Sequence, residues 1–222
     1  EHTYDSLKEA SNNAPPGETV VILPGTYSGK GNRDISFLGR AITVRSLDPN
    51  DSKVVAGTVI DCQGTQVVQH QGFVFKTGES ARSVLAGLTI TNAYSTYGGG
   101  ISCANNSSPT ISKCVFKGNR ASQRGGGIYN ASGSPLITNC IFSSNTAAEG
   151  GALYNYSTAR VVNCTFTGNS TTTGGGIHNQ GGALTLTNCI LWNNTPAEVR
   201  VGAGTVSVTY SDIRGGFTGA GN

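Results

Sequence analysis

The chain spells GGGIYN at residues 125–130, GGALYN at 150–155 and GGGIHN at 174–179. A motif that returns every 24 or 25 residues indicates a solenoid, in which each repeat packs only on its neighbours. Cysteine recurs with the same period, at Cys114, Cys140, Cys164 and Cys189. The glycine motif and the cysteine allow the repeats to be aligned with one another, and we call each set of aligned positions a column.

Further columns appear once the repeats are aligned on cysteine. Phenylalanine lies two residues after the cysteine, at Phe116, Phe142 and Phe166, and asparagine five residues after it, at Asn119, Asn145, Asn169 and Asn194. The repeats are rich in Gly, Ser, Thr and Asn, with short alternating apolar runs and no helical period, which indicates strands. We therefore predict an all-β fold, a parallel β-helix of about seven to eight coils with three short strands and three bends in each.

Stacking of the coils assigns a place to each column. The cysteines and phenylalanines should fill the narrow interior, while asparagine side chains should form hydrogen-bonded ladders at the bends. The glycine motif is then a corner of the coil: Ile128 points inward, Tyr129 outward, and Asn130 begins the next bend. The repeated motif therefore predicts a structural role for these residues, as corners and interior positions of the coil.

We predict one domain over residues 1–222, made of an N-terminal cap (1–18), less regular coils (19–97), clear repeats (98–194), and a last coil with an open end (195–222). A short amphipathic helix after Asp5 or Ser6, ended by Pro15 and Pro16, should cover the first strand edge. No comparable cap follows Ile213. We expect either a domain excised from a longer protein or end-to-end packing through the open C-terminal coil.

The repeats resemble a known family. GGGI and GGAL alternate with FKGN (116–119), FSSN (142–145) and FTGN (166–169), which is similar to the paired GGA[ILV] and FxxN repeats of polymorphic outer-membrane proteins, whose autotransporter passengers are β-helical. The whole chain also looks like the right-handed parallel β-helix modules of large secreted or cell-surface bacterial proteins. The resemblance implies adhesion or surface architecture, a right-handed coil and a secreted or cell-surface location.

The composition excludes some partners. Lys and Arg number 15 and Asp and Glu 12, giving a net charge of +3 without a basic run, so we expect no nucleic-acid partner. No stretch approaches the roughly 20 apolar residues that a membrane span needs, so we expect no direct membrane insertion.

The six cysteines leave two interpretations open. Stacked cysteines would lie close enough for disulfides, but side chains that point the same way fit the disulfide torsion poorly, so buried free thiols are favoured. The sequence has no CxxC pair, and His2, His70 and His178 are far apart in the repeat scheme. We therefore predict no metal site and no cofactor.

The case for an enzyme is weak at the sequence level. Between Gly98 and Asn194 the only acidic residue is Glu149, and Asp61, Glu79 and Asp212 look like isolated solvated or turn residues. We predict no catalytic residues and a non-catalytic, adhesin-like scaffold. The alternative is a carbohydrate-binding or polysaccharide-processing β-helix.

We predict that a glycan or other cell-surface ligand would bind to a stack of aromatic side chains that point outward. The residues of this predicted strip are Tyr129, Tyr154 and His178, with Tyr156 near its edge. The same stack could instead serve only to stabilise neighbouring coils.

Overall fold

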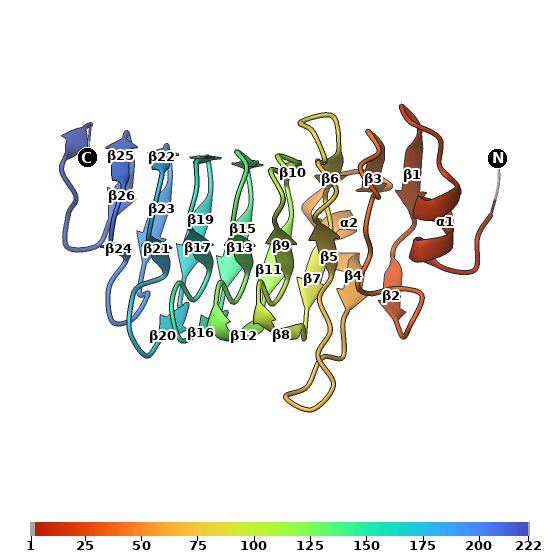
Figure 1. The fold of residues 1–222 in the computed structure, drawn as a ribbon, viewed down its shortest axis with the longest axis horizontal. Coiled ribbons are helices and arrows are strands. Elements are labelled where there is room, and N and C mark those ends of the chain that lie inside the picture. Colours follow the sequence, from red (N-terminus) through yellow and green to blue (C-terminus); the bar gives the residue numbers. More distant parts are fainter. Residues whose placement is uncertain (1–2, 222) are drawn as a thin grey trace.

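The coils of the chain stack along one axis as a parallel β-helix, with the N-terminus at one end of the rod and the C-terminus at the other (Figure 1). This computed structural model describes residues 3–221, so the prediction for His2 lies outside the described residues. Two long sheets of nine and eight strands give about eight turns. The predicted fold class is confirmed.

Four parallel sheets run along the rod, and we name them A to D. Sheet A contains β1 (Thr19–Ile22), β3 (Thr43–Ser46), β6 (Val84–Ala86), β10 (Thr110–Ser112), β14 (Leu136–Thr138), β18 (Ala159–Val162), β22 (Ala183–Thr187), β25 (Thr205–Thr209) and β27 (Gly219–Ala220). Sheet B contains β2 (Gly25–Ser28), β4 (Thr58–Asp61), β7 (Thr89–Thr91), β11 (Val115–Lys117), β15 (Ile141–Ser143), β19 (Thr165–Thr167), β23 (Ile190–Trp192) and β26 (Asp212–Ile213).

Sheets C and D are shorter. Sheet C contains β5 (Phe73–Phe75), β9 (Ile101–Cys103), β13 (Ile128–Asn130), β17 (Leu153–Asn155), β21 (Ile177–Asn179) and β24 (Val199–Val201). Sheet D contains β8 (Tyr94–Tyr97), β12 (Arg120–Arg124), β16 (Thr146–Ala147) and β20 (Ser170–Thr171). The prediction of three strands per coil therefore misses sheet D, which has only four strands, two of which, β16 and β20, are two residues long and too short to show alternation in a sequence.

The vertical register places like residues on like. Phe116 pairs with Phe142, and Phe142 with Phe166, so their rings stack in the interior at centroid distances of 4.7 and 4.6 Å. All six cysteines are buried free thiols, which selects the second of the two interpretations of the cysteines. Cys114, Cys140, Cys164 and Cys189 follow strands of sheet A that pair in register. Burial of these columns supplies the hydrophobic free energy of the rod.

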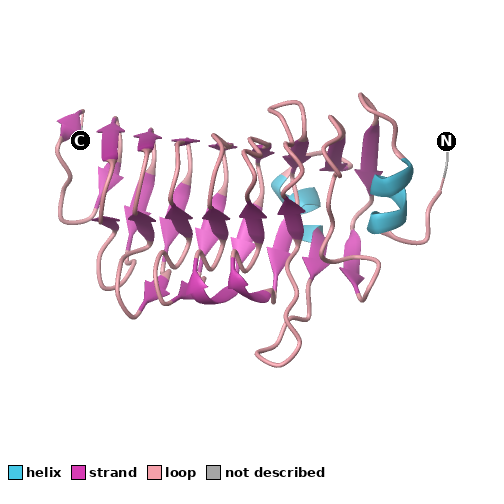
Figure 2. Cartoon of the chain, viewed as in Figure 1, coloured by secondary structure: helices cyan, strands magenta, loops and turns pink. Residues whose placement is uncertain are grey.

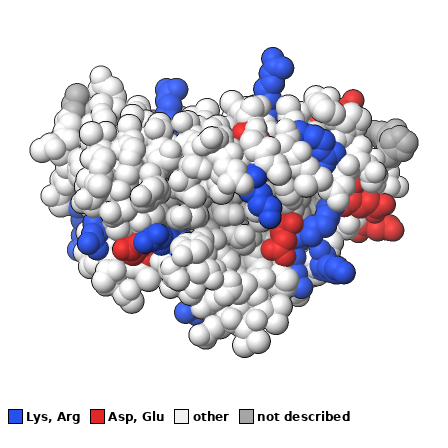
Figure 3. Space-filling view, in the orientation of Figure 1, with Lys and Arg blue, Asp and Glu red and all other residues white. Residues whose placement is uncertain are grey.

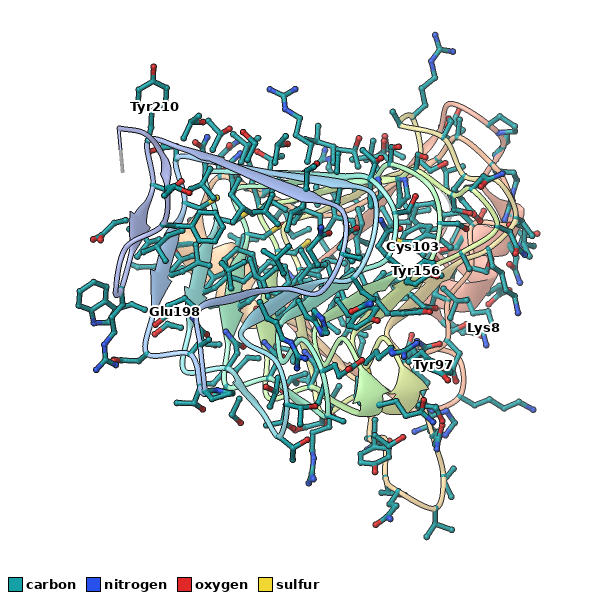
Figure 4. All side chains as sticks on the ribbon, turned by 60° about the vertical axis from the view of Figure 1, so that its left-hand side comes forward. Lys8, Tyr97, Cys103, Tyr156, Glu198 and Tyr210 are labelled. Carbon is teal, nitrogen blue, oxygen red and sulfur yellow. The ribbon has the colours of Figure 1, made fainter. Side chains whose placement is uncertain are left out.

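The predicted asparagine ladder is confirmed, and it has a direction. Asn119 donates its side-chain amide to Asn145 at 3.1 Å, Asn145 to Asn169 at 2.9 Å, and Asn169 to Asn194 at 2.8 Å. Asn194 in turn donates to the carboxylate of Glu198, which lies at the C-terminal end of the rod (Figure 4). Every amide dipole therefore points the same way, and the positive end of the row meets an anion.

The first coil is covered as predicted. Helix α1 (Leu7–Asn13) begins after Ser6, whose side chain accepts a hydrogen bond from the Glu9 N–H, and it buries Leu7 and Ala10. A second helix, α2 (Ser52–Gly57), was not predicted; Asp51 caps it, and it buries only Val55. Both helices lie in the N-terminal half of the rod, and the rest consists of strands joined by loops and turns (Figure 2).

Candidate functional site

A glycine bend joins sheet D to sheet C in three successive coils. Gly98, Gly125 and Gly150 adopt φ angles of +65°, +67° and +63°, and a Cβ at any of them would collide with the carbonyl oxygen three residues later. Only glycine fits such a tight turn. The bend brings the residue before each glycine, which is Tyr97, Arg124 or Glu149, towards the outer face of sheet C.

The outer face of sheet C carries one continuous column of side chains. The register pairs Ser102 with Tyr129, Tyr129 with Tyr154, Tyr154 with His178, and His178 with Arg200. The rings of Tyr129 and Tyr154 lie 5.7 Å apart, and those of Tyr154 and His178 5.0 Å apart at 73°. We call Tyr129, Tyr154, His178 and Arg200 the outer column. Such ring pairs add stability to neighbouring strands.

Residues before the glycine bend pack on this column from one coil away. The ring of Tyr97 stacks on Tyr129 at 5.2 Å. The guanidinium of Arg124 lies 5.0 Å from the centre of the Tyr154 ring, which is a cation–π contact, and its Nε donates to Glu149 Oε2 at 3.0 Å. The bend therefore brings the residues that precede the glycines into contact with the outer column, so that they form one cluster.

The predicted strip is corrected in one respect. Tyr154 is 0% exposed and His178 1% exposed, so neither side chain faces open solvent in this arrangement. The reason is the glycine bend, which lays Arg124 over Tyr154. Tyr156 is 56% exposed and Tyr97 40%, so these two tyrosines present ring surface to solvent (Figure 4).

Three residues of the cluster were not predicted as site residues from the sequence: Tyr97, Arg124 and Glu149. The fold brings Glu149 close enough to His178 for its charge to offset part of the fall in the histidine's pKa that burial causes. The signal that was available is positional: each of the three residues directly precedes a glycine of the repeated motif. The position before the glycine indicates a site residue only when it is known that the glycine bend folds back on sheet C.

Burial decides the protonation states in the cluster. It lowers the pKa of His178 below its ordinary value, and Arg200 and Arg124 lower it further, so the ring is neutral near pH 7 despite Glu149. Burial also raises the pKa of Tyr154, so its hydroxyl keeps its proton. The cluster thus offers a phenol and a neutral imidazole beside a paired Arg124 and Glu149.

The carboxylates of Glu79 and Asp61 form hydrogen bonds within the fold. Glu79 was predicted to be a solvated or turn residue, but it is 1% exposed and accepts hydrogen bonds from Thr77, Gly39 and Ser107. The physical reason is that its carboxylate fastens three loops, which removes it from solvent. Asp61 is the last residue of strand β4 rather than a turn residue, and its carboxylate accepts hydrogen bonds from the Gln63 N–H at 3.2 Å and from Asn92 Nδ2 at 3.0 Å.

Two depressions on the surface lie away from the outer column. One of about 440 Å³ borders α1 and is lined by Ser6, Lys8 and Lys30 among others. Another of about 410 Å³ lies on the outer face of sheet D, where Arg120 packs over the Tyr94 ring at 5.7 Å. On the face shown in Figure 3, charged side chains gather towards the N-terminal end.

Within residues 3–221 no helix is both long and apolar enough to pass through a lipid bilayer. The described residues also hold no cluster of three or more His, Cys, Asp or Glu side chains arranged to bind a metal ion.

Comparison with known proteins supports the fold. The model of the right-handed β-helix region matches residues 48–215, well over half of the 222 residues. The comparisons with curated proteins and with solved structures find no match. The stacked register, the buried asparagine ladder and the matched family model agree, and the chain belongs to the right-handed β-helix family.

Proposed function

We propose that the chain is a non-catalytic, adhesin-like scaffold module of a secreted or cell-surface protein. The observation that supports this role is the unbroken register of sheet A, in which nine strands pair in parallel from β1 to β27. A rod whose interior rings, thiols and amides stack coil on coil has a fixed length and resists bending. The resemblance of its glycine and FxxN repeats to polymorphic outer-membrane proteins supports the surface location.

The state of the reactive groups supports a role without catalysis. Burial raises the pKa of the Cys62 and Cys103 thiols strongly, so they are not nucleophiles near neutral pH. The carboxylate of Glu149 is bound to Arg124, and that of Glu79 is held by loop hydrogen bonds. A glycosidase uses two carboxylates that face one bond, and Glu149 has no acidic neighbour in the cluster.

A turnover assay tests this proposal. The protein is incubated with a panel of acidic and neutral polysaccharides, and new reducing ends and ultraviolet absorbance from unsaturated sugars are recorded. We expect neither signal to rise above that of a heat-denatured sample. Sustained product formation that scales with protein concentration would overturn the non-catalytic role.

Carbohydrate binding is a second candidate, favoured by the exposed tyrosines. Tyr97 stacks on Tyr129, and Tyr156 exposes more than half of its surface, so aromatic rings are available to pack against sugar rings. Tyrosine fluorescence titrated with oligosaccharides should then shift, and Tyr156→Ala should reduce the shift. A titration that leaves both fluorescence and melting temperature unchanged argues against it.

A further inference from the structure

The outer face of sheet B, which runs along the rod (Figure 1), carries an exposed tryptophan. Trp192 is the only tryptophan in the sequence, and it is 45% exposed. Ile190 faces the same way along β23 and is 48% exposed, because side chains alternate along a strand and Leu191 between them is buried. Tryptophan is enriched at the centres of protein interfaces, so this strand marks a candidate interface.

Three neighbouring strands, β15, β19 and β23, form an uncharged surface around the tryptophan. Their outward side chains lie in two columns, on either side of the buried column that contains Phe142, Phe166 and Leu191. Ile141 on β15 is 45% exposed, so apolar surface reaches across all three strands. We call the six outward residues the sheet B patch: Ile141, Ser143, Thr165, Thr167, Ile190 and Trp192.

Charged side chains flank the sheet B patch at both ends. Lys117 lies in line with Ser143 on the N-terminal side, and Asp212 lies in line with Ile190 on the C-terminal side. Arg214 also faces outward, and both it and Asp212 are exposed. Within residues 3–221 neither of these two forms an ion pair, and Arg214 donates only to Asn193 Oδ1, at 2.7 Å. The last coil therefore presents an acid and a base whose charges are not paired with each other.

We propose that the sheet B patch binds a second copy of this chain, with the two rods side by side and pointing the same way. The two-fold axis is parallel to the rods, so each coil faces the same coil of the second copy with its strands reversed. Trp192 then packs on Ile190 of the second copy, and Asp212 meets Arg214 of the second copy. Facing sheets pack about 10 Å apart, and the side chains of the patch fill that space. The pairing goes beyond the scaffold role, which requires no partner.

Charge complementarity selects this orientation. Rods that pointed in opposite directions, centred on β19, would place Lys117 opposite Arg214 of the second copy, and like charges that face each other destabilise an interface. The parallel arrangement instead pairs Asp212 with Arg214 twice. Three strands about 4.8 Å apart cover much less than the about 800 Å² per partner of a stable interface. We therefore expect a weak dimer, with a dissociation constant on the order of 100 µM.

Sedimentation equilibrium between about 10 µM and about 1 mM measures this association, and the emission of the single tryptophan reports its burial in the same samples. The average mass should rise towards twice that of the monomer, and the emission should shift to shorter wavelength. Ile190→Thr should weaken the dimer about tenfold while it keeps Trp192 as the probe. Val67→Thr is the matched control, at an exposed valine of the loop between β4 and β5, and should leave the association unchanged.

Charge reversal tests the orientation. Asp212→Arg and Arg214→Asp each place two like charges on the last coil, so each variant alone should stay monomeric. An equimolar mixture of the two should dimerise again, because each acid of one variant then faces a base of the other. Melting followed by circular dichroism shows whether every variant is folded.

The possible outcomes are distinct. A wild type that stays monomeric at about 1 mM would overturn the dimer and leave the scaffold role standing. Equal weakening by Ile190→Thr and Val67→Thr would overturn the sheet B patch as the contact. A wild type that dimerises beside a mixture that does not would overturn the parallel arrangement.

Discussion

Replacing Asn145 with alanine tests the inner asparagine ladder. Asn145 Oδ1 accepts from the Asn119 N–H at 3.0 Å and from Asn119 Nδ2 at 3.1 Å, and its own Nδ2 donates to Phe116 O and Asn169 Oδ1, both at 2.9 Å. The side chain is fully buried, so water cannot replace these partners. At about 1 kcal/mol per hydrogen bond, the loss amounts to about 4 kcal/mol.

Urea unfolding followed by circular dichroism measures this loss. With a slope of about 2 kcal/mol per molar urea, the midpoint should fall by about 2 M, a large part of the 5–15 kcal/mol that stabilises a typical domain. A lower slope in the variant would indicate that the coils on either side of residue 145 no longer unfold together.

The matched control lies in the exposed ladder at the turn before the cysteines. Asn163 makes two side-chain amide bonds to its neighbours, at 3.2 and 2.7 Å, but it is exposed and adopts a φ of +55°. Asn163→Gly keeps that φ and should cost no more than about 1 kcal/mol, since water replaces the lost partners. If the Asn145 and Asn163 variants lose the same stability, burial is not what makes the inner ladder matter, and the reasoning fails.

Three more predictions concern the charged loop residue, the thiols and the bend. Burial alone would raise the pKa of Glu79, but its hydrogen bonds outweigh this and hold it below the ordinary 4.5. The ionised Glu79 therefore stabilises the fold above pH 4.5, and this stabilisation is lost as the pH falls through the lower pKa of the folded state. The melting temperatures of the wild type and of Glu79→Gln should therefore converge as the pH is lowered. A difference in melting temperature that stays constant with pH would refute this. All six cysteines are at most 1% exposed, and burial raises the pKa of Cys189 to about 11. A thiol reagent at about pH 8 should therefore modify none of them in the native protein and all of them in urea, because the reagent cannot reach a buried thiol. Rapid labelling of the native protein would contradict the buried column. Gly126→Ala should lower the free energy of unfolding in urea by more than about 2 kcal/mol, because its Cβ would collide with backbone oxygens. Gly168 has open space around it, so Gly168→Ala should cost only about 1 kcal/mol, which comes from its φ of +62°. Equal losses in the two variants would refute the steric explanation.

Residues with a repeated spelling could be placed from the sequence. The phenylalanines, cysteines and inner asparagines recur at one spacing, and in a solenoid equal spacing means vertical alignment, so their contacts followed without coordinates. The cap could be placed for a similar reason, because Ser6 and the prolines are local signals that do not depend on the rest of the fold.

Residues that do not repeat were placed poorly. Helix α2 interrupts the early coils once, and no second copy exists to reveal it. Glu79 looked isolated because two of its partners, Gly39 and Ser107, approach it from loops that are distant in the sequence. The burial of Tyr154 was missed for the same reason, since the residue that covers it lies 30 positions earlier.

The sequence by itself determined the coil, its period and the inward or outward sense of the repeated strand positions, because a periodic chain repeats its local geometry. Only the tertiary structure decided which outward side chains meet across the glycine bend, how deeply Tyr154 and His178 are buried, and which polar atoms lack a partner. The physical reason is that side-chain periodicity is a property of a single strand, whereas burial depends on the angle at which two sheets join.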